Sequence, residues 1–310
     1  MQNTKINTIA LYGLGYVGKA FLAYAKKHVD IDFYDPKFDK RPPKHLKFCD
    51  AAVICVPTPT AEDGSCDTSI VEETVRNVEQ DIVLIKSTVS PGTTERLAKE
   101  TGKTILFSPE FISESSYNNP FYKTMADTPF IIMGGDKAAR EAWMGFFQDI
   151  HGPTAKYFQC SSTEAELIKY TANAYSALKV TFVNEMYEIA KIFDADWHTI
   201  REGWLLDQRV EPMSTMVFPH KRGYSGKCLP KDVLALLTAS HKAGYEAAFI
   251  REIHSSNLRF AAERLGEFLL SANRAHTSNE FLVEKTVKDN ESTLFTPSFA
   301  SKKSLATANK

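Results

Sequence analysis

The sequence has no long hydrophobic run and no excess of charge of either sign. No stretch of about 18 apolar residues occurs, so no segment is expected to cross a bilayer as a helix. The 37 Lys and Arg residues balance 38 Asp and Glu residues to a net charge of -1, which gives no electrostatic attraction to nucleic acid or to an anionic membrane. The first residues are polar, and the apolar segment 6–12 is too short for a signal peptide. We therefore expect a cytoplasmic protein with neither a nucleic-acid nor a membrane partner.

Cysteines and suitably spaced histidines are also scarce. The five cysteines are odd in number and include no CxxC pair, which argues against a disulfide framework and against a zinc site. None of the eight histidines has the HxxxH spacing of a metal-binding helix, so we expect no metal. Four cysteines are interpreted as small buried apolar residues: Cys49, Cys55, Cys66 and Cys160. The fifth, Cys228, stands in a different context.

The first half of the chain alternates short apolar runs with helical patterns, which is typical of an α/β fold with helices on both faces of a sheet. The pattern predicts a Rossmann-like, doubly wound, mostly parallel sheet. Seven strands are expected, at residues 6–12, 31–34, 51–56, 82–86, 104–107, 130–133 and 155–158.

The second half is predicted to be helical. A segment of about thirty residues, 163–193, is long for a globular helix, and we expect its first residue, Thr163, to form a capping box with Glu166. Such a helix suits a domain junction or a dimer interface, so a homodimer is expected. Further helices are predicted at 231–243 and 248–270. The expected domains are a cofactor-binding domain (1–160), a helical central and dimerisation domain (161–272) and a partly disordered polar tail (273–310).

The segment GLGYVG, residues 13–18, follows the first apolar run and opens a predicted helix at 16–27. Gly13 permits a tight turn, Gly15 lets the backbone approach a pyrophosphate, and Gly18 allows the helix to pack closely on the strand. The helix N-terminus adds free N–H groups and partial positive charge. Two further residues complete the expected cofactor loop: Tyr16 and Val17.

An acidic residue, Asp35, ends the second predicted strand about 20 residues after the glycines. A carboxylate there accepts hydrogen bonds from the adenosine ribose and repels a 2′-phosphate, which favours NAD over NADP. The nearby cations Lys37, Lys40 and Arg41 weaken that preference. The expected cofactor is NAD.

Polar residues follow the later strands at the positions where cofactors bind in such folds. Pro57 and Thr58 end one strand, and Thr88 follows the next. Two carboxylates, Glu110 and Glu114, come after a further strand. Taken alone, the loops are ordinary strand ends and the two acids could be surface residues.

Two polar residues of the long helix, Lys169 and Asn173, lie four apart and therefore share a face. A cation and an amide donor there could stabilise the alkoxide that develops when an alcohol is oxidised. Cys228 could add to the resulting aldehyde as a thiolate, because the segment GYSGKCLPKD surrounds it with glycines and charges. The positive potential that a thiolate needs could come from four sources: Lys227, Lys231, Lys169 or a helix beginning after Pro230. The competing interpretation is a solvated helix face and a buried cysteine.

Six motifs in order are similar to those of the UDP-glucose/GDP-mannose dehydrogenase family, the nucleotide-sugar 6-dehydrogenases. They are GLGYVG, VPTP, STV with PGTT, PEF, the Lys-x-x-x-Asn helix face and GYSGKCLPKD, and they span residues 6–270. The resemblance implies that Cys228 is a covalent nucleophile, that Lys169 and Asn173 stabilise the reacting oxygen, and that Asp232 is their polar partner.

The same resemblance assigns roles to the loop residues. Thr88 would hold a water, Glu114 would assist hydrolysis of a thioester, and Glu110 would be a second active-site carboxylate. Arg209 would reach the substrate of a neighbouring subunit. The remaining implied sets are Pro57, Thr58, Thr88 and Glu114 at the cofactor, and Glu110, Phe111, Ile112, Gly223 and Gly226 at the substrate.

The sequence departs from the family in three places. It ends in a polar tail where relatives continue into a nucleotide-binding domain, its segment between Asp35 and Ala51 leaves room only for a loop or a short helical turn, and Lys227 precedes the cysteine. The resemblance implies a short form that oxidises a nucleotide sugar by four electrons, with UDP-glucose to UDP-glucuronate as the first candidate. Two alternatives stay open: a two-electron hydroxyacid dehydrogenase that needs no cysteine, and an NAD-binding protein without catalysis.

Overall fold

The computed structural model describes residues 5–113 and 121–275, with side chains described up to residue 262. The first half forms a seven-stranded sheet in the order β2-β1-β3-β4-β5-β6-β7. All neighbouring strands are parallel except β5 and β6, which pair antiparallel. The strands are β1 (Thr8–Tyr12), β2 (Asp30–Tyr34), β3 (Ala51–Ile54), β4 (Ile82–Ile85), β5 (Thr104–Phe107), β6 (Phe130–Gly134) and β7 (Lys156–Cys160).

Helices cover both faces of this sheet, which explains why its central strands are continuous apolar runs. Alternate residues of β3 and β4 enter opposite cores: Val53 and Leu84 face one side, Ile54 and Ile85 the other. The first core includes side chains of α1 (Tyr16–Ala25) and α4 (Lys137–His151), and the second those of α2 (Ser69–Asn77) and α3 (Thr93–Thr101). Two short 3₁₀ helices, η1 (Lys44–Phe48) and η2 (Met125–Asp127), lie in the connections.

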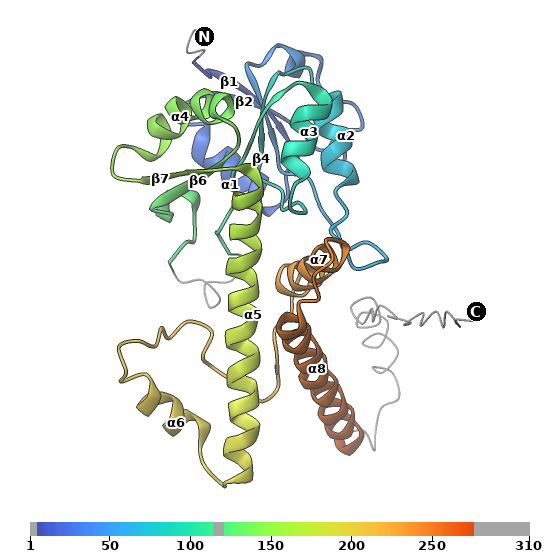
Figure 1. Ribbon diagram of the computed structural model, residues 1–310, viewed down its shortest axis with the longest axis vertical. Coiled ribbons are helices and arrows are strands. Elements are labelled where there is room, and N and C mark those ends of the chain that lie inside the picture. The colour runs from blue at the N-terminus through green and yellow to red at the C-terminus, as the bar shows by residue number, and fades with distance from the viewer. Residues whose placement is uncertain (1–4, 114–120, 276–310) are drawn as a thin grey trace, which may run out of the picture.

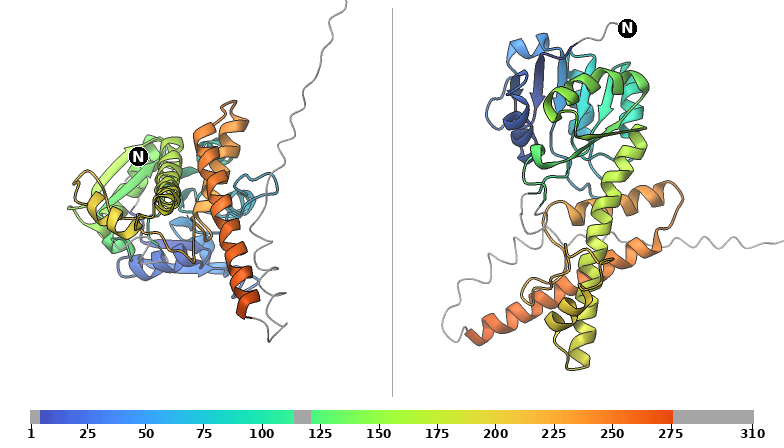
Figure 2. Two further views of the ribbon diagram at one scale, coloured as in Figure 1. Left: turned by 90° about the horizontal axis from the view of Figure 1, so that it is seen from below. Right: turned by 90° about the vertical axis from the view of Figure 1, so that its left-hand side faces the viewer.

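A 31-residue helix, α5 (Ser162–Ile192), begins at the sheet and runs away from it (Figure 1). At about 1.5 Å per residue it is roughly 46 Å long. Its far part packs against α6 (Trp197–Trp204) and the segment that follows, through Val183, Trp197 and Val217. On another side it contacts α7 (Leu229–Lys242) and α8 (Ala248–Ala275), and α8 crosses it in Figure 2. Within the described ranges, none of the helices combines the length and apolarity needed to cross a membrane.

The predicted fold class and all seven predicted strands are confirmed, with boundaries that differ by at most two residues at either end. The predicted short turn between Asp35 and Ala51 is also found, as η1. The antiparallel β5–β6 pair and helix α6 were not predicted. The expected tail lies outside the described residues from 276 onward, since α8 extends to Ala275, and the division into domains remains a prediction.

The predicted N-terminus of the long helix is wrong by one position and in its capping residues. The capping box consists of Ser161 and Glu164, whose side chains bond to each other's backbone N–H groups. Thr163 lies inside the first turn. Glu166 is fully buried and accepts hydrogen bonds from α3 instead. Sequence spacing alone did not distinguish the two Glu residues, because both follow a hydroxyl residue by three positions.

Candidate active site

The glycine loop between β1 and α1 has the geometry expected of a dinucleotide site. Gly13 has φ +90°, and a Cβ on it would lie 2.6 Å from the carbonyl oxygen of Cys55. A Cβ on Gly18 would lie 2.0 Å from the Gly13 carbonyl oxygen, so the helix can approach the strand only without a side chain there. Around Gly15, in contrast, a Cβ would meet nothing within 4 Å in the described part of the chain. The loop is tightly packed on its inner side and open at Gly15, as close approach of a pyrophosphate requires.

The N-terminus of α1 is electrostatically suited to an anion. The N-cap, Gly15, has no side chain to cap the helix, and the first turn of α1 contains no acidic residue, so its N–H groups and dipole can act on a phosphate. Asp35, at the end of β2, accepts the Leu14 N–H at 2.7 Å and the Lys37 N–H at 2.9 Å. The acid predicted for the ribose therefore lies directly beside the glycine loop. The chain's own residues fit NAD.

Later strands end at the same edge of the sheet because they run parallel to β1. Pro57 and Thr58 follow β3, and Thr88 follows β4. The hydroxyl of Ser87 donates to the carbonyl of Val56 at 2.7 Å and so joins these two loops. The predicted cofactor residues are thus adjacent through β1, β3 and β4.

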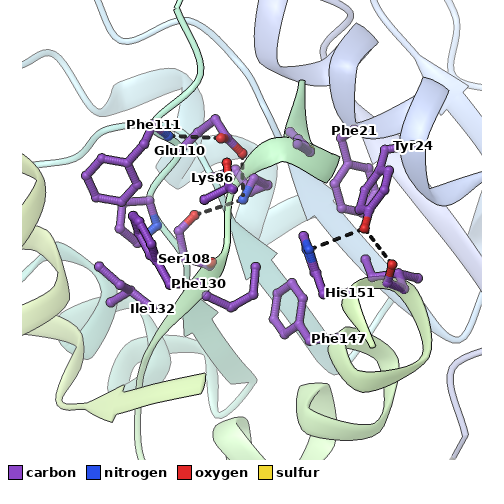
Figure 3. Close-up of a pocket in the computed structure, with 15 residues that line it drawn as sticks. Phe21, Tyr24, Lys86, Ser108, Glu110, Phe111, Phe130, Ile132, Phe147 and His151 are labelled. Atoms are coloured by element: carbon purple, nitrogen blue, oxygen red, sulfur yellow. Dashed lines mark hydrogen bonds and ion pairs between the residues drawn. The ribbon is translucent and has the colours of Figure 1, made fainter. Parts of the chain in front are cut away.

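Glu110 follows β5 and is held by several donors (Figure 3). Its Oε1 accepts the N–H groups of Phe111 and Ile112 at 2.9 and 3.1 Å. Its Oε2 lies 3.3 Å from the Nζ of Lys86, which also donates to the carbonyl of Ser108 at 3.2 Å. Lys86 was not predicted as a site residue. The sequence signal that could have identified it is its position directly after the apolar strand β4. A lysine at the end of a buried strand is itself buried and needs an acidic partner.

Lys169 reaches the same loop from α5. Its Nζ donates to the backbone carbonyl of Glu110 at 2.7 Å and lies 5.0 Å from the centre of the Phe111 ring. Burial lowers the pKa of Lys169 below its ordinary value, although the charges of Asp232, Cys228 and Glu110 act in the opposite direction. Phe111 and Ile112 themselves are half-buried.

One turn further along α5, Asn173 contacts the first turn of α7. Its Nδ2 donates to Oδ2 of Asp232 at 2.5 Å, while Nζ of Lys231 lies 2.6 Å from Oδ1 of the same carboxylate. Asp232 is 2% exposed. Burial opposes the charge of Lys231, but Asp232 and the neighbouring thiols outweigh it and hold the pKa of Lys231 above its ordinary value. Asn173 and Asp232, which the resemblance implies as site residues, are therefore in direct contact.

Cys228 is the N-cap of α7 and is exposed. A thiol at a helix N-terminus is favoured in its thiolate form, and Cys228 interacts electrostatically with the ammonium groups of both Lys169 and Lys231. Gly223 and Gly226 precede it with φ +72° and +87°. A Cβ on Gly223 would lie 2.5 Å from Oδ1 of Asn257, so this approach to the cysteine requires glycine.

One predicted site residue is not brought to this cluster, and another is not described. The Arg209 side chain is 89% exposed, pairs with Asp207, and follows α6. Glu114 lies outside the described residues. The other predicted residues lie at the strand ends, in the first turn of α1, on α5, in the segment that leads into α7, or in the first turn of α7.

Glu166, which was expected to act only in a capping box, instead joins α5 to α3. Its Oε2 accepts the N–H of Gly92 at 2.5 Å and its Oε1 the N–H of Thr94 at 2.9 Å. Gly92 is the N-cap of α3 and has no side chain, so the carboxylate from α5 supplies the cap. Burial raises the pKa of Glu166 to about 7.

Comparison with known proteins agrees with this geometry. The NAD-binding domain of the UDP-glucose/GDP-mannose dehydrogenase family matches residues 34–150, and the central domain of the same family matches residues 163–259. The UDP-glucose 6-dehydrogenase of Pseudomonas aeruginosa is 30% identical over 241 residues, which are 72% of this chain and 52% of that protein. The GDP-mannose 6-dehydrogenase of Azotobacter vinelandii is 30% identical over 230 residues, 66% of this chain and 50% of that protein.

Among solved structures, a UDP-glucose dehydrogenase from Pyrobaculum islandicum superposes with a TM-score of 0.68 at 28% identity, covering 87% of this chain and 72% of that one. A 3-hydroxyisobutyrate dehydrogenase from Mycobacterium tuberculosis, at 16% identity and a TM-score of 0.59, shares the fold alone. The chain spans about half the length of the curated relatives it matches. Through its NAD-binding and central domains, the chain belongs to the UDP-glucose/GDP-mannose dehydrogenase family.

Proposed function

We propose that the protein oxidises the primary alcohol of a nucleotide sugar to a carboxylate, with NAD as oxidant and Cys228 as covalent nucleophile. UDP-glucose is the first candidate substrate. The observation that carries the proposal is that Lys169 on α5 interacts electrostatically with both Asp232 and Cys228. Asp232 is hydrogen-bonded to Asn173, one turn further along α5, and Cys228 occupies the N-cap position of α7. A two-electron dehydrogenase has no need of that cysteine.

The first oxidation requires the alcohol proton to leave. Burial lowers the pKa of Lys169, so near neutral pH its amine is neutral, and able to accept a proton, more often than that of an exposed lysine. Asn173 donates an amide hydrogen to the same oxygen and is oriented by Asp232. Both groups act where negative charge develops. The Gly13–Gly18 loop, Asp35 and the loops of Thr58 and Thr88 would hold one NAD at a time, and NAD would supply the hydride acceptor. Each oxidation passes one hydride to one NAD, so two NAD are consumed per sugar.

The aldehyde is then retained by Cys228. The thiolate adds to the carbonyl carbon, forms a C–S bond, and leaves the oxygen beside Lys169 and Asn173. The second oxidation converts this adduct to a thioester. Water then adds to the thioester carbon, the C–S bond breaks, and the thiolate leaves as the carboxylate forms. Glu110, whose carboxylate pairs with Lys86 and whose backbone carbonyl accepts a hydrogen bond from Lys169, is a described acid that we assign to direct that water.

Counting NADH per substrate tests the proposal. The full chain is incubated with NAD and a panel of nucleotide sugars that includes UDP-glucose and GDP-mannose. Two NADH per sugar consumed, and the corresponding uronate by mass spectrometry, are expected. One NADH per sugar would favour the two-electron alternative, in which Cys228→Ser leaves turnover nearly unchanged. NAD binding without turnover of any sugar would favour the non-catalytic alternative. Either of these last two results contradicts the proposal.

We also propose a homodimer built on α5. Four large apolar side chains on this helix are exposed by 38 to 56%, at spacings of eight, seven and seven residues that place them along one stripe: Leu167, Tyr175, Phe182 and Ile189. A stripe of this length is unusual on a monomer surface. Sedimentation velocity is expected to show a dimer that Phe182→Glu weakens, and a monomer at micromolar wild-type concentration would refute the assignment.

A further inference from the structure

Two lysines from different elements hold the short segment between Ser108 and Ile112. Lys86 donates to the carbonyl of Ser108 and pairs with the carboxylate of Glu110. Lys169 donates to the carbonyl of Glu110. The segment is therefore fixed from the sheet on one side and from α5 on the other, and both contacts meet at Glu110.

The Lys86–Glu110 ion pair is deeply buried, so replacing either residue by a neutral one should destabilise the protein. The side chains are 5% and 10% exposed, and a charge left alone at such a site is strongly disfavoured. The adjoining cavity, lined by Lys86, Ser108 and Glu110 among others, measures about 20 Å³. That is room for about one water molecule. A single water there could donate a hydrogen bond to the carboxylate, but it carries no charge and so cannot neutralise the carboxylate as the ammonium of Lys86 does.

We propose that Lys86 is a positioning residue: it fixes the side chain and peptide of Glu110 and, through the Glu110 carbonyl, the ammonium of Lys169. This inference rests on the proposed function for its consequence in catalysis. Lys86 does not touch the substrate in this assignment. It acts because the Glu110 carbonyl and carboxylate belong to one residue, so that a shift of the carboxylate also displaces the acceptor of Lys169.

The kinetic test compares Lys86→Met with Lys103→Met. Lys103 is a matched control, because its Nζ also donates to two backbone carbonyls, those of Val78 and Gln80, each at 2.8 Å. Lys103 precedes β5 and Glu110 follows β5, so the two residues lie at opposite ends of this strand. Lys86→Met is expected to lower kcat by on the order of 10- to 100-fold, with little change in KM for NAD, and to shift the acid limb of the pH–rate profile upward. Lys103→Met should change neither. Equal kcat values and pH profiles for the two variants would overturn the proposal.

Comparing the thermal stability of single and double variants at Lys86 and Glu110 tests the role of Lys86 without measuring turnover. Lys86→Met alone leaves the Glu110 carboxylate without its ammonium partner and is expected to lower Tm by roughly 10 °C at pH 8. The double variant Lys86→Met with Glu110→Gln should recover most of that loss, which also covers the case in which the single variant does not fold. In hydrogen exchange, the peptide containing the Phe111 and Ile112 amides should exchange faster in Lys86→Met than in Lys103→Met.

Failure of the proposed function and failure of the proposed role of Lys86 give different results. Absence of turnover in the wild-type protein would refute the proposed function and leave the stability comparison and the exchange experiment valid. A double variant as unstable as the single one, or unchanged exchange at Phe111 and Ile112, would refute the role of Lys86 whatever the substrate.

Discussion

Substitution of Glu166 by Gln is expected to remove a pH dependence of stability between pH 5 and 8. The Glu166 carboxyl is fully buried, and burial raises its pKa from 4.5 to about 7. In the unfolded chain the group loses its proton near 4.5, so between these values the folded state binds more protons than the unfolded state. Stability from this group is therefore fully present below pH 4.5 and is lost as pH rises through 7.

The magnitude follows from the shift. At about 1.36 kcal/mol per pKa unit, a rise from 4.5 to about 7 corresponds to about 3 kcal/mol of unfolding free energy. The glutamine side chain of the variant cannot titrate, and its single carbonyl oxygen can serve only one of the N–H groups of Gly92 and Thr94. The variant should thus carry a cost of about 1 to 3 kcal/mol at low pH. Because the wild type loses about 3 kcal/mol of this stabilisation as the pH rises to about 8, the difference between the two proteins should fall to about zero or favour the variant.

The assay is guanidinium denaturation of wild type and Glu166→Gln at half-unit steps from about pH 5 to 8. The difference between the two proteins is the informative quantity, because other groups titrate in both. His151, whose pKa burial lowers to about 4, contributes with the opposite sign, since its stability is lost as pH falls from 6.5. Glu164→Gln is the matched control on the exposed side of the same helix turn, and its difference from wild type should stay constant. A constant difference for Glu166→Gln as well would refute the reasoning and show that the two N–H donors and the α3 dipole keep Glu166 ionised.

Three further predictions concern the site. Gly18→Ala places a Cβ 2.0 Å from the Gly13 carbonyl, so NAD affinity measured by calorimetry should fall while Gly145→Ala, where a Cβ meets nothing described within 4 Å, leaves it unchanged. Cys228→Ser should abolish formation of the carboxylate and leave NAD affinity intact; undiminished acid production would exclude a thioester. Asp232→Asn removes the charge that pairs with Lys231 and orients Asn173, and kcat should fall by about 10- to 100-fold. An unchanged rate would show that Asn173 holds its position without the carboxylate.

The fold was largely predictable because most strands can be recognised from the pattern of apolar residues within each strand. Burial on both faces makes β3 and β4 uninterrupted apolar runs, and the glycine loop between β1 and α1 is recognisable from residue type alone. The antiparallel contact of β6 was not predictable, since strand direction is set by the connection between β5 and β6 and leaves no pattern in either strand. Helix α6 is short, and its apolar Trp197 is buried only by packing against α5 and the segment after α6.

Candidate site residues could be singled out from the sequence where several unusual neighbours stand beside them. Contacts could not be predicted where the partner lies far along the chain. Cys228 was distinguished by its glycines and charges. Lys86 was missed because its partner, Glu110, follows the next strand of the sheet. Glu166 was misassigned because local spacing offered a nearer explanation than its contacts with α3, more than seventy residues away.

Helix α5 explains how these distant contacts form one site. Glu166, Lys169 and Asn173 are spaced three and four residues apart, so they share one face of the helix. Along this face the helix contacts, in turn, the N-terminus of α3, the carbonyl of Glu110 and the carboxylate of Asp232. Each contact joins a polar group of α5 to a different part of the chain. A change in the rotation of α5 would therefore disturb all three together, which is why a capping carboxylate outside the reacting centre is expected to matter to the placement of Lys169 and Asn173.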